Sequence, residues 1–491
     1  MTVSEVAASP PPNIEQPSSR RWLVLAVIAL AQVMVVLDAT VVNIALPSAQ
    51  QDLRFGDSQR QWLITGYALS FGSLLLIGGR IADLFGRRMA FLAGVVGFAI
   101  ASAVGGAAAN FEVLVAARVG QGVFAALLAP AALSLLTTTF TDPAERGKAF
   151  GIFGAISGAG GAIGLLLGGV LTEYLDWRWC MYINLVFAGV AFVGGIGLLG
   201  KSTATERPKL DLIGVTTATA GMFALVYGLA NAEQDGWDAA STLGFLAAGV
   251  VLLGAFVFSQ TRVAHPLLPL RILAHRNRGG AFLAMFLLVA GMFVIFLFLT
   301  FYMQQNLRFG PVQSGFAFLP MIGTLMLSAT MATTVLLPRV GPRVMIPVGM
   351  VVAALGTAHM ALLDETSTYA SGVLPGLLVA GLGIGLTMAS GMNVAIAGVD
   401  PQDSGAASAA VNAIQQVGGS IGTALFSTIA ANAFTAALME GKDQAAAAIA
   451  SYGAAFAWSA GTFAVGGVVS ALVLRSGVPA ELKSAGPAVH M

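Results

Sequence analysis

Charged residues are scarce in this chain of 491 residues: only 10% are Asp, Glu, Lys or Arg, against about 25% in an average soluble protein. A soluble chain of this length would fold into two or three domains, each with a charged surface. The charges present are too few to cover such surfaces. The composition therefore excludes an ordinary set of soluble domains.

Cysteine, histidine and an excess of either charge are also nearly absent. The single cysteine, Cys180, excludes an internal disulfide framework. A net charge of +1 without a basic block argues against a nucleic-acid-binding protein. The four histidines do not gather with other ligand-type residues, so we expect no metal site and no cofactor.

Apolar residues are abundant, at 57% of the chain, and the mean hydropathy is +0.84. A bilayer core about 30 Å thick needs roughly 20 apolar residues per helix. The sequence predicts an all-α polytopic membrane protein with fourteen such helices, at residues 22–46, 61–79, 89–108, 112–136, 148–171, 180–199, 212–230, 242–260, 281–303, 312–336, 344–362, 371–392, 405–431 and 452–474.

The distribution of lysine and arginine predicts the orientation of these helices. Eighteen of these residues fall on the side that holds both termini, and five fall on the other side. We therefore expect a multi-pass protein of the bacterial inner membrane, with a disordered cytoplasmic tail at 1–21 and a second cytoplasmic tail at 476–491.

An internal repeat divides the chain. The sequence GGAIG at 160–164 returns as GGSIG at 418–422, which is 258 residues later. The repeat predicts two six-helix bundles, 22–200 and 281–475, with an inserted, peripheral helix pair and its connectors at 201–280. Repeated halves around a midplane site are typical of secondary transporters, although chance similarity between glycine-rich helices also explains such a match.

Asp38 lies inside the first predicted helix, where burial of a carboxylate costs several kcal/mol and needs a reason. It is either a structural, permanently paired acid or a group that takes up and releases a proton. Arg118 lies inside the fourth helix, and both residues are roughly 10–14 Å from the predicted outer surface. Equal depth favours an ion pair between them, and the pair is the predicted proton-coupling site.

Two glycine-containing segments are candidates for regions that move when the protein changes conformation. The loop GGRIADLFGRR has two interpretations. Its charges either only set the orientation of the protein in the membrane, or they form a cytoplasmic latch in one conformational state that breaks in the other. The residues of this predicted latch are Gly79, Arg80, Asp83, Gly86, Arg87 and Arg88. The fifth helix presents a smooth face that allows close packing or sliding, through Gly160, Gly161, Gly164, Gly168 and Gly169.

Polar residues inside other helices are candidates for a substrate cavity. They are Asn43, Tyr67, Gln121, Asn412, Gln415 and Gln416. Nucleotide-binding patterns at 195–202 lie at the end of an apolar helix rather than between a strand and a helix, so we reject a phosphate site. No catalytic cluster accompanies them, and we predict that the protein is not an enzyme.

These motifs together resemble the major facilitator superfamily, and within it the fourteen-helix drug:proton antiporters. LDATVVNIALP (37–47), GRIADLFGRR (79–88), ARVGQG (117–122) and WRWCMYIN (177–184) are similar to family motifs. The resemblance implies proton coupling through Asp38 and Arg118 and a gating role for the loop. The family's antiporter motif usually has a proline where this chain has Leu165.

The resemblance implies a monomeric, proton-coupled exporter of amphipathic, often cationic, drugs, which takes protons, small molecules and membrane lipid as its partners. An exporter dedicated to one endogenous metabolite, lipid or siderophore is the alternative. A passive facilitator and a polytopic membrane enzyme are further alternatives, and the latter would need a catalytic cluster at a membrane edge.

Overall fold

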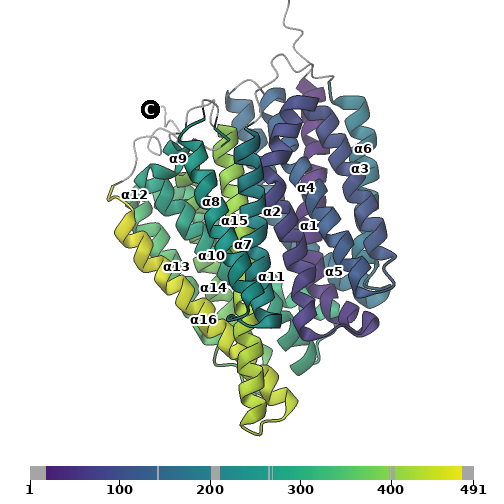
Figure 1. Ribbon diagram of the computed structural model, residues 1–491, viewed down its shortest axis with the longest axis vertical. Helices are drawn as coiled ribbons and strands as arrows, with labels where there is room; N and C mark the ends of the chain where they lie inside the picture. Colours follow the sequence, from purple (N-terminus) through teal and green to yellow (C-terminus); the bar gives the residue numbers. More distant parts are fainter. Residues whose placement is uncertain are drawn as a thin grey trace, which may run out of the picture.

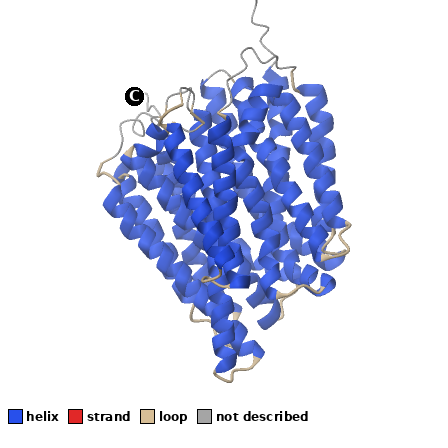
Figure 2. Cartoon of the chain, in the orientation of Figure 1, coloured by secondary structure: helices blue, strands red, loops and turns tan. Residues whose placement is uncertain are grey.

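The computed structural model describes residues 18–140, 143–200, 211–263, 266–267, 269–397, 399 and 404–477. Helices joined by short loops fill the molecule, and within these ranges the chain forms no β-strand (Figure 2). The predicted all-α class is confirmed. Most of the two predicted tails, 1–21 and 476–491, lies outside the described residues.

The N-terminal half consists of six long helices: α1 (Ser18–Leu53), α2 (Asp57–Phe85), α3 (Arg87–Gly106), α4 (Phe111–Thr139), α5 (Pro143–Tyr174) and α6 (Trp179–Leu198). In contrast to the predicted tail 1–21, α1 begins at Ser18. The reason is an ion pair of 2.7 Å between Arg21 Nη1 and Glu145 Oε2, which ties the first turns of α1 to α5. We call the end at which α1 begins the inner end, and the opposite end the outer end, following the predicted orientation.

An inserted helix pair follows, α7 (Leu212–Asp235) and α8 (Ala240–Gln260). We expected both at the periphery, and α8 does pack mainly against α7. In contrast, α7 packs against α2 of the N-terminal half and α15 of the C-terminal half. Thr219 on α7 donates to the carbonyl oxygen of Ser73 on α2 at 3.0 Å, so α7 is joined to the bundle rather than only lining it.

The C-terminal half contains the remaining elements: α9 (Leu270–Ala274), α10 (Arg276–Phe301), the π-helical turn η1 (Tyr302–Asn306), α11 (Pro311–Met331), the π-helical turn η2 (Ala332–Leu336), α12 (Leu337–Val340), α13 (Pro342–Met360), the π-helical turn η3 (Tyr369–Val373), α14 (Leu374–Ile396), α15 (Ser404–Met439) and α16 (Gln444–Val473). The two halves lie side by side in Figure 1. The predicted domain boundaries stay predictions.

The last two helices are longer than the predicted ranges 405–431 and 452–474, and their hairpin projects at the outer end (Figure 1). Asp443 explains the early start of α16, because its carboxylate caps the helix by accepting from the backbone N–H of Ala446 at 2.8 Å. Apolar runs predict the part of a helix inside lipid, whereas a cap extends the helix beyond it.

A long helix lies over each of the fourteen predicted ranges in the described part of the chain. Twelve of the described helices are long and apolar enough to cross a membrane. The helices α2 and α5 contribute shorter apolar stretches, Trp62–Leu75 and Ile163–Tyr174. The membrane-protein fold is therefore confirmed, and the number of fourteen spans stays a prediction.

The repeated glycine segments occupy matching places in the two halves. Gly164 of α5 lies against α1, where its Cα faces Leu37 and Thr40. Gly422 of α15 lies against α10, where it faces the backbone of Ala290. Close helix approach requires small residues at such points. The repeat thus builds the same pair of tightly packed helices twice, α1 with α5 and α10 with α15.

This packing predicts different effects for two glycines of one helix. A methyl group at Gly164 would collide with the Thr40 hydroxyl and lie 3.1 Å from the Leu37 carbonyl oxygen, whereas the nearest atom at Gly161 is 3.9 Å away. We expect Gly164→Ala to lower the free energy of unfolding by about 1–3 kcal/mol, and Gly161→Ala to leave it nearly unchanged. Thermal unfolding of the purified protein in detergent measures both, and equal losses would contradict the assigned contact.

Candidate functional site

An ion pair between Asp38 of α1 and Arg118 of α4 lies in the interior of the N-terminal half. The Nη1 atom of Arg118 donates to Asp38 Oδ2 at 2.5 Å, and the two side chains are 3% and 0% exposed. The two residues are 80 positions apart in the sequence. The structure therefore brings together the two residues that the sequence placed at equal depth.

Two side-chain amides complete the coordination of the Asp38 carboxylate. The other carboxylate oxygen, Oδ1, accepts from Nε2 of Gln121 at 2.7 Å and from Nδ2 of Asn184 at 2.7 Å. Both amides also lie within hydrogen-bonding distance of the Ser102 hydroxyl oxygen, at 2.8 Å and 3.4 Å. Helices α1, α3, α4 and α6 thus contribute to one buried polar cluster, which we call the Asp38 cluster.

Arg118 is held by more than its carboxylate partner. Its Nε atom donates to the carbonyl oxygen of Leu63 at 3.0 Å, and its Nη1 atom also donates to Gln121 Oε1 at 2.8 Å. The guanidinium carbon lies 4.4 Å from the centre of the Tyr67 ring, in a cation–π contact. A buried ion pair is tolerated only when further hydrogen bonds satisfy both partners, and this cluster supplies them.

Sequence reasoning missed two members of the cluster. Asn184 ends the motif WRWCMYIN, for which the sequence predicts no role, and it is completely buried. Ser102 is a small polar residue in an apolar helix, and nothing in the sequence around it indicates a functional role. Tyr67 and Gln121, two of the predicted substrate-cavity residues, contact Arg118, and their place in a substrate cavity stays a prediction.

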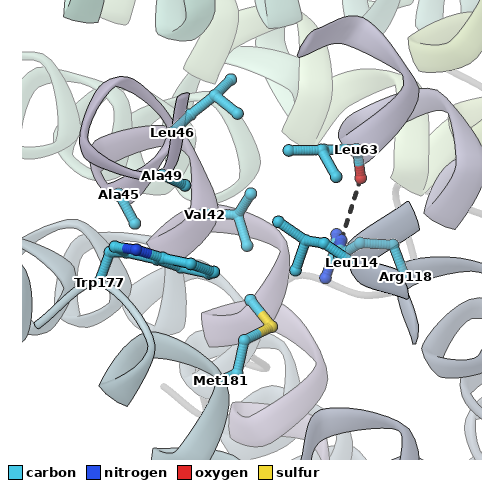
Figure 3. A pocket seen from close by; sticks show the side chains of 9 residues that line it. All are labelled: Val42, Ala45, Leu46, Ala49, Leu63, Leu114, Arg118, Trp177 and Met181. Atoms are coloured by element: carbon cyan, nitrogen blue, oxygen red, sulfur yellow. Dashed lines mark hydrogen bonds between the residues drawn. The ribbon is translucent and has the colours of Figure 1, made fainter. Parts of the chain in front are cut away.

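A small apolar cavity lies beside the cluster, with room for about one water molecule. Among the described residues that line it, Arg118 alone is charged, and Figure 3 shows that side chain bonded to Leu63 at one side of the cavity and the Trp177 ring at the other. Trp177 donates through its indole N–H to Asp52 at 3.0 Å, near the outer end of α1. The remaining lining residues are apolar: Val42, Ala45, Leu46, Ala49, Leu114 and Met181.

The inner loop between α2 and α3 contains the predicted latch. Gly86 separates the two helices with a φ of 95°, a conformation that favours glycine. Nη2 of Arg88 donates to the carbonyl oxygen of Ile196 at 2.7 Å, in the last turn of α6 and therefore within the N-terminal half. The Asp83 side chain lies outside the described part of the chain. The latch, through these residues with Gly79, Arg80 and Arg87, stays a prediction.

The glycine face of α5 contacts two different helices. Gly160, Gly164 and Gly168 face α1, at Val36, Leu37 and Val41. Gly169 instead faces α11, where an added methyl group would lie 2.7 Å from the Pro311 carbonyl oxygen. The same face thus packs one bundle internally and contacts the other bundle near the outer end.

Three further contacts join the two halves near the outer end. Glu173 accepts from the backbone N–H of Val312 at 2.8 Å. Gln304 donates to the Ile44 carbonyl oxygen at 3.2 Å, and the Arg60 guanidinium lies 4.2 Å from the centre of the Phe301 ring. The halves are therefore closed against each other at this end.

An outer loop borders this closed end. Hydrogen bonds from the side chains of Thr366 and Ser367 hold the pKa of Asp364 below its usual value. The hydroxyl of Tyr302 donates to the Asp364 carbonyl oxygen at 2.9 Å and ties η1 to the loop.

The other predicted cavity residues are spread over two helices. Asn43 is buried in α1 and donates to the Ala39 carbonyl oxygen at 3.2 Å. Asn412 and Gln415 are half-buried on α15, the helix that packs against α2. The Gln416 side chain lies outside the described residues. A cavity lined by this set stays a prediction.

Comparison with known proteins gives a consistent result. Residues 28–423 match the sequence family described as the Major Facilitator Superfamily. The puromycin resistance protein pur8 of Streptomyces alboniger is 49% identical over 427 residues, which cover 86% of this chain and 84% of that protein. The cephamycin export protein CmcT of Amycolatopsis lactamdurans is 38% identical, covering 81% of this chain and 83% of that protein.

The fold is similar to a solved structure. A bacterial homologue of the human lysosomal transporter Spinster, in an inward-facing and unoccupied conformation, aligns with a TM-score of 0.65 at 16% identity. The alignment covers 93% of this chain and 97% of that one. At this identity the similarity concerns the fold alone.

Proposed function

This chain belongs to the major facilitator superfamily, and from that premise we propose that it is a proton-coupled antiporter that exports antibiotics and similar amphipathic compounds. We further propose that it acts as a monomer in the bacterial inner membrane, with both termini in the cytoplasm. The coupling ion is the proton, and no cofactor takes part. The protein is a transporter and not an enzyme, as the family and its relatives indicate.

The Asp38 cluster is the observation that carries the proposal. An ionisable residue inside a membrane-spanning helix faces a large desolvation penalty and is retained where function needs it. Asp38 is fully buried, and its carboxylate accepts hydrogen bonds from Arg118, Gln121 and Asn184. A carboxylate in such a position can exchange a proton, which an aliphatic or amide side chain cannot do.

The proposed cycle begins with proton uptake by Asp38 from the outer side. Protonation removes the negative charge and weakens the pairing with Arg118, while Leu63, Gln121 and Tyr67 still hold the guanidinium. The weakened link between α1 and α4 permits the change to an inward-facing state. Substrate then binds from the cytoplasm or inner leaflet, and release of the proton restores the pair and favours the outward-facing state.

Two relatives suggest the substrate class. The relative with 49% identity is named for resistance to puromycin, so puromycin is the first compound to test. A narrower second candidate is an exporter dedicated to one endogenous compound. It is favoured by the relative named for cephamycin export.

Transport by the purified protein in lipid vesicles tests the proposal. We expect puromycin to accumulate in vesicles with an acidic lumen, by up to about tenfold per unit of pH difference for a one-to-one exchange. A protonophore should abolish the accumulation, since it removes the driving force.

Two results would contradict this proposal. Uptake that stops at equal concentrations and ignores the protonophore would identify a passive facilitator. Transport of an endogenous metabolite together with no transport of puromycin and unrelated dyes would identify the dedicated exporter instead.

A further inference from the structure

The two amides that bind the Asp38 carboxylate differ in their freedom to rotate. Gln121 uses both ends of its amide: Nε2 donates to Asp38, and Oε1 accepts from Arg118 at 2.8 Å. Turning this amide over would direct its N–H₂ group at the guanidinium, so two donors would oppose each other. The orientation of Gln121 is therefore fixed by Arg118.

Asn184 has no such restraint. Its Nδ2 atom donates to Asp38 at 2.7 Å, whereas its Oδ1 atom is buried and accepts no hydrogen bond from the part of the chain that the structure describes. A buried hydrogen-bond acceptor without a donor is unusual in a folded protein and therefore needs an explanation. Turning the Asn184 amide over breaks no hydrogen bond at Oδ1, and it places an acceptor where a donor now stands.

Protonation of Asp38 creates the need for such an acceptor. The carboxylate accepts only, whereas a carboxylic acid has one O–H group that must donate. A proton added to Oδ1 would face two N–H donors, those of Gln121 and Asn184. One of the two amides must turn, and only Asn184 is free to do so.

We propose that Asn184 is the positioning residue for the coupling proton: it donates to the Asp38 carboxylate and turns its amide over to accept from the protonated acid. This inference rests on the proposed role of Asp38 as the proton carrier. In the step, an incoming proton forms an O–H bond at Asp38 Oδ1. The N–H···O bond from Asn184 breaks, and an O–H···O bond to Asn184 Oδ1 replaces it.

Ser102 fits both orientations of the amide. At present its hydroxyl oxygen lies 2.8 Å from Gln121 Nε2 and 3.4 Å from Asn184 Nδ2, where it accepts. After the turn it can still accept from Gln121 while its own proton points to Asn184 Oδ1. A hydroxyl is both donor and acceptor and adapts by rotation.

Other groups near Asp38 leave this role to Asn184. The titratable or charged side chains that interact with Asp38 are Arg118 from α4, Tyr67 from α2 and Cys180 from α6. Arg118 has no acceptor atom. Neither Tyr67 nor Cys180 makes a hydrogen bond to Asp38 in the described part of the molecule, and Cys180 bonds instead with Thr172.

Infrared spectroscopy of the full chain in lipid vesicles tests the proposal without a substrate. The carboxylic acid band that disappears in Asp38→Asn identifies protonated Asp38. We expect Asn184→Leu to raise the frequency of this band, because the acid has lost its acceptor.

A matched substitution separates this role from a structural one. Asn393 of α14 is half-buried, and within the described structure its amide donates to its own helix, at the Ala389 carbonyl oxygen. Asn393→Leu should leave the band frequency unchanged. If Asn184→Leu does not fold, Asn184→Ala is measured in the same way.

The outcomes separate the proposed role of Asp38 as proton carrier from the proposed role of Asn184. If no acid band disappears in Asp38→Asn at any pH, Asp38 does not carry the proton and the proposed function fails. If the band is present but the Asn184 variant leaves its frequency in place, only the turning amide is wrong.

Discussion

Replacement of Asp38 by asparagine is expected to abolish gradient-driven export, with a rate at least about 100-fold lower than that of the wild type. Asparagine has nearly the same shape and can still accept hydrogen bonds from Gln121 and Asn184. It cannot bind a proton at any physiological pH. The substitution therefore removes the coupling step while it keeps most of the packing.

The measurement compares two modes of transport in reconstituted vesicles. Accumulation against a gradient requires proton exchange, whereas exchange of labelled for unlabelled substrate does not. We expect Asp38→Asn to lose the first and to retain the second. Gradient-driven accumulation at the wild-type rate would show that Asp38 is a structural acid.

Asp52 supplies a matched control on the same helix. It lies at the outer end of α1 with its side chain 48% exposed, and it pairs with Arg178 at 2.5 Å. Asp52→Asn makes the same chemical change outside the Asp38 cluster. We expect this variant to accumulate substrate as the wild type does, so that a loss in Asp38→Asn alone assigns the effect to the buried position.

Replacement of Arg118 by leucine is expected to produce the largest loss of stability, about 3–5 kcal/mol. The substitution leaves the fully buried Asp38 carboxylate without its counter-charge. It also removes the hydrogen bonds to Leu63 and Gln121.

Thermal unfolding of the purified variants in detergent measures this loss. The double variant with Asp38→Asn and Arg118→Leu should recover much of the stability, because it buries no unpaired charge. Arg178→Leu breaks a pair that is partly exposed, at 28% and 48%, and such pairs contribute about 1 kcal/mol or less. If Arg118→Leu is no more destabilising than Arg178→Leu, the Asp38 pair is not an energetically coupled unit.

Several parts of the site were predictable because they depend on short segments. Hydropathy is a local property, so the scarcity of charge isolates Asp38 and Arg118 inside apolar helices. Depth follows from counting residues at about 1.5 Å each from a helix end. Spacing also places Gln121 three residues after Arg118, on the same helix face.

Other parts were not predictable, because they depend on which helices become neighbours. Asn184 reaches Asp38 across 146 positions, and Ser102 joins them from a third helix. Neither residue stands out in its own segment. The contact of α7 with both halves is of the same kind, since its apolar sequence is equally suited to lipid and to protein neighbours.

The sequence by itself determined the all-helical membrane fold, the internal repeat of the glycine segment, and the two charges that carry the proposed coupling. Each of these follows from composition, periodicity or spacing within the chain. The tertiary structure alone decided which helices pack together, the partners of those charges, and the different hydrogen bonds of the Gln121 and Asn184 amides. The physical reason is that a buried hydrogen-bond network is set by the packing of several helices, and one-dimensional patterns do not encode the lateral order of helices in a bundle.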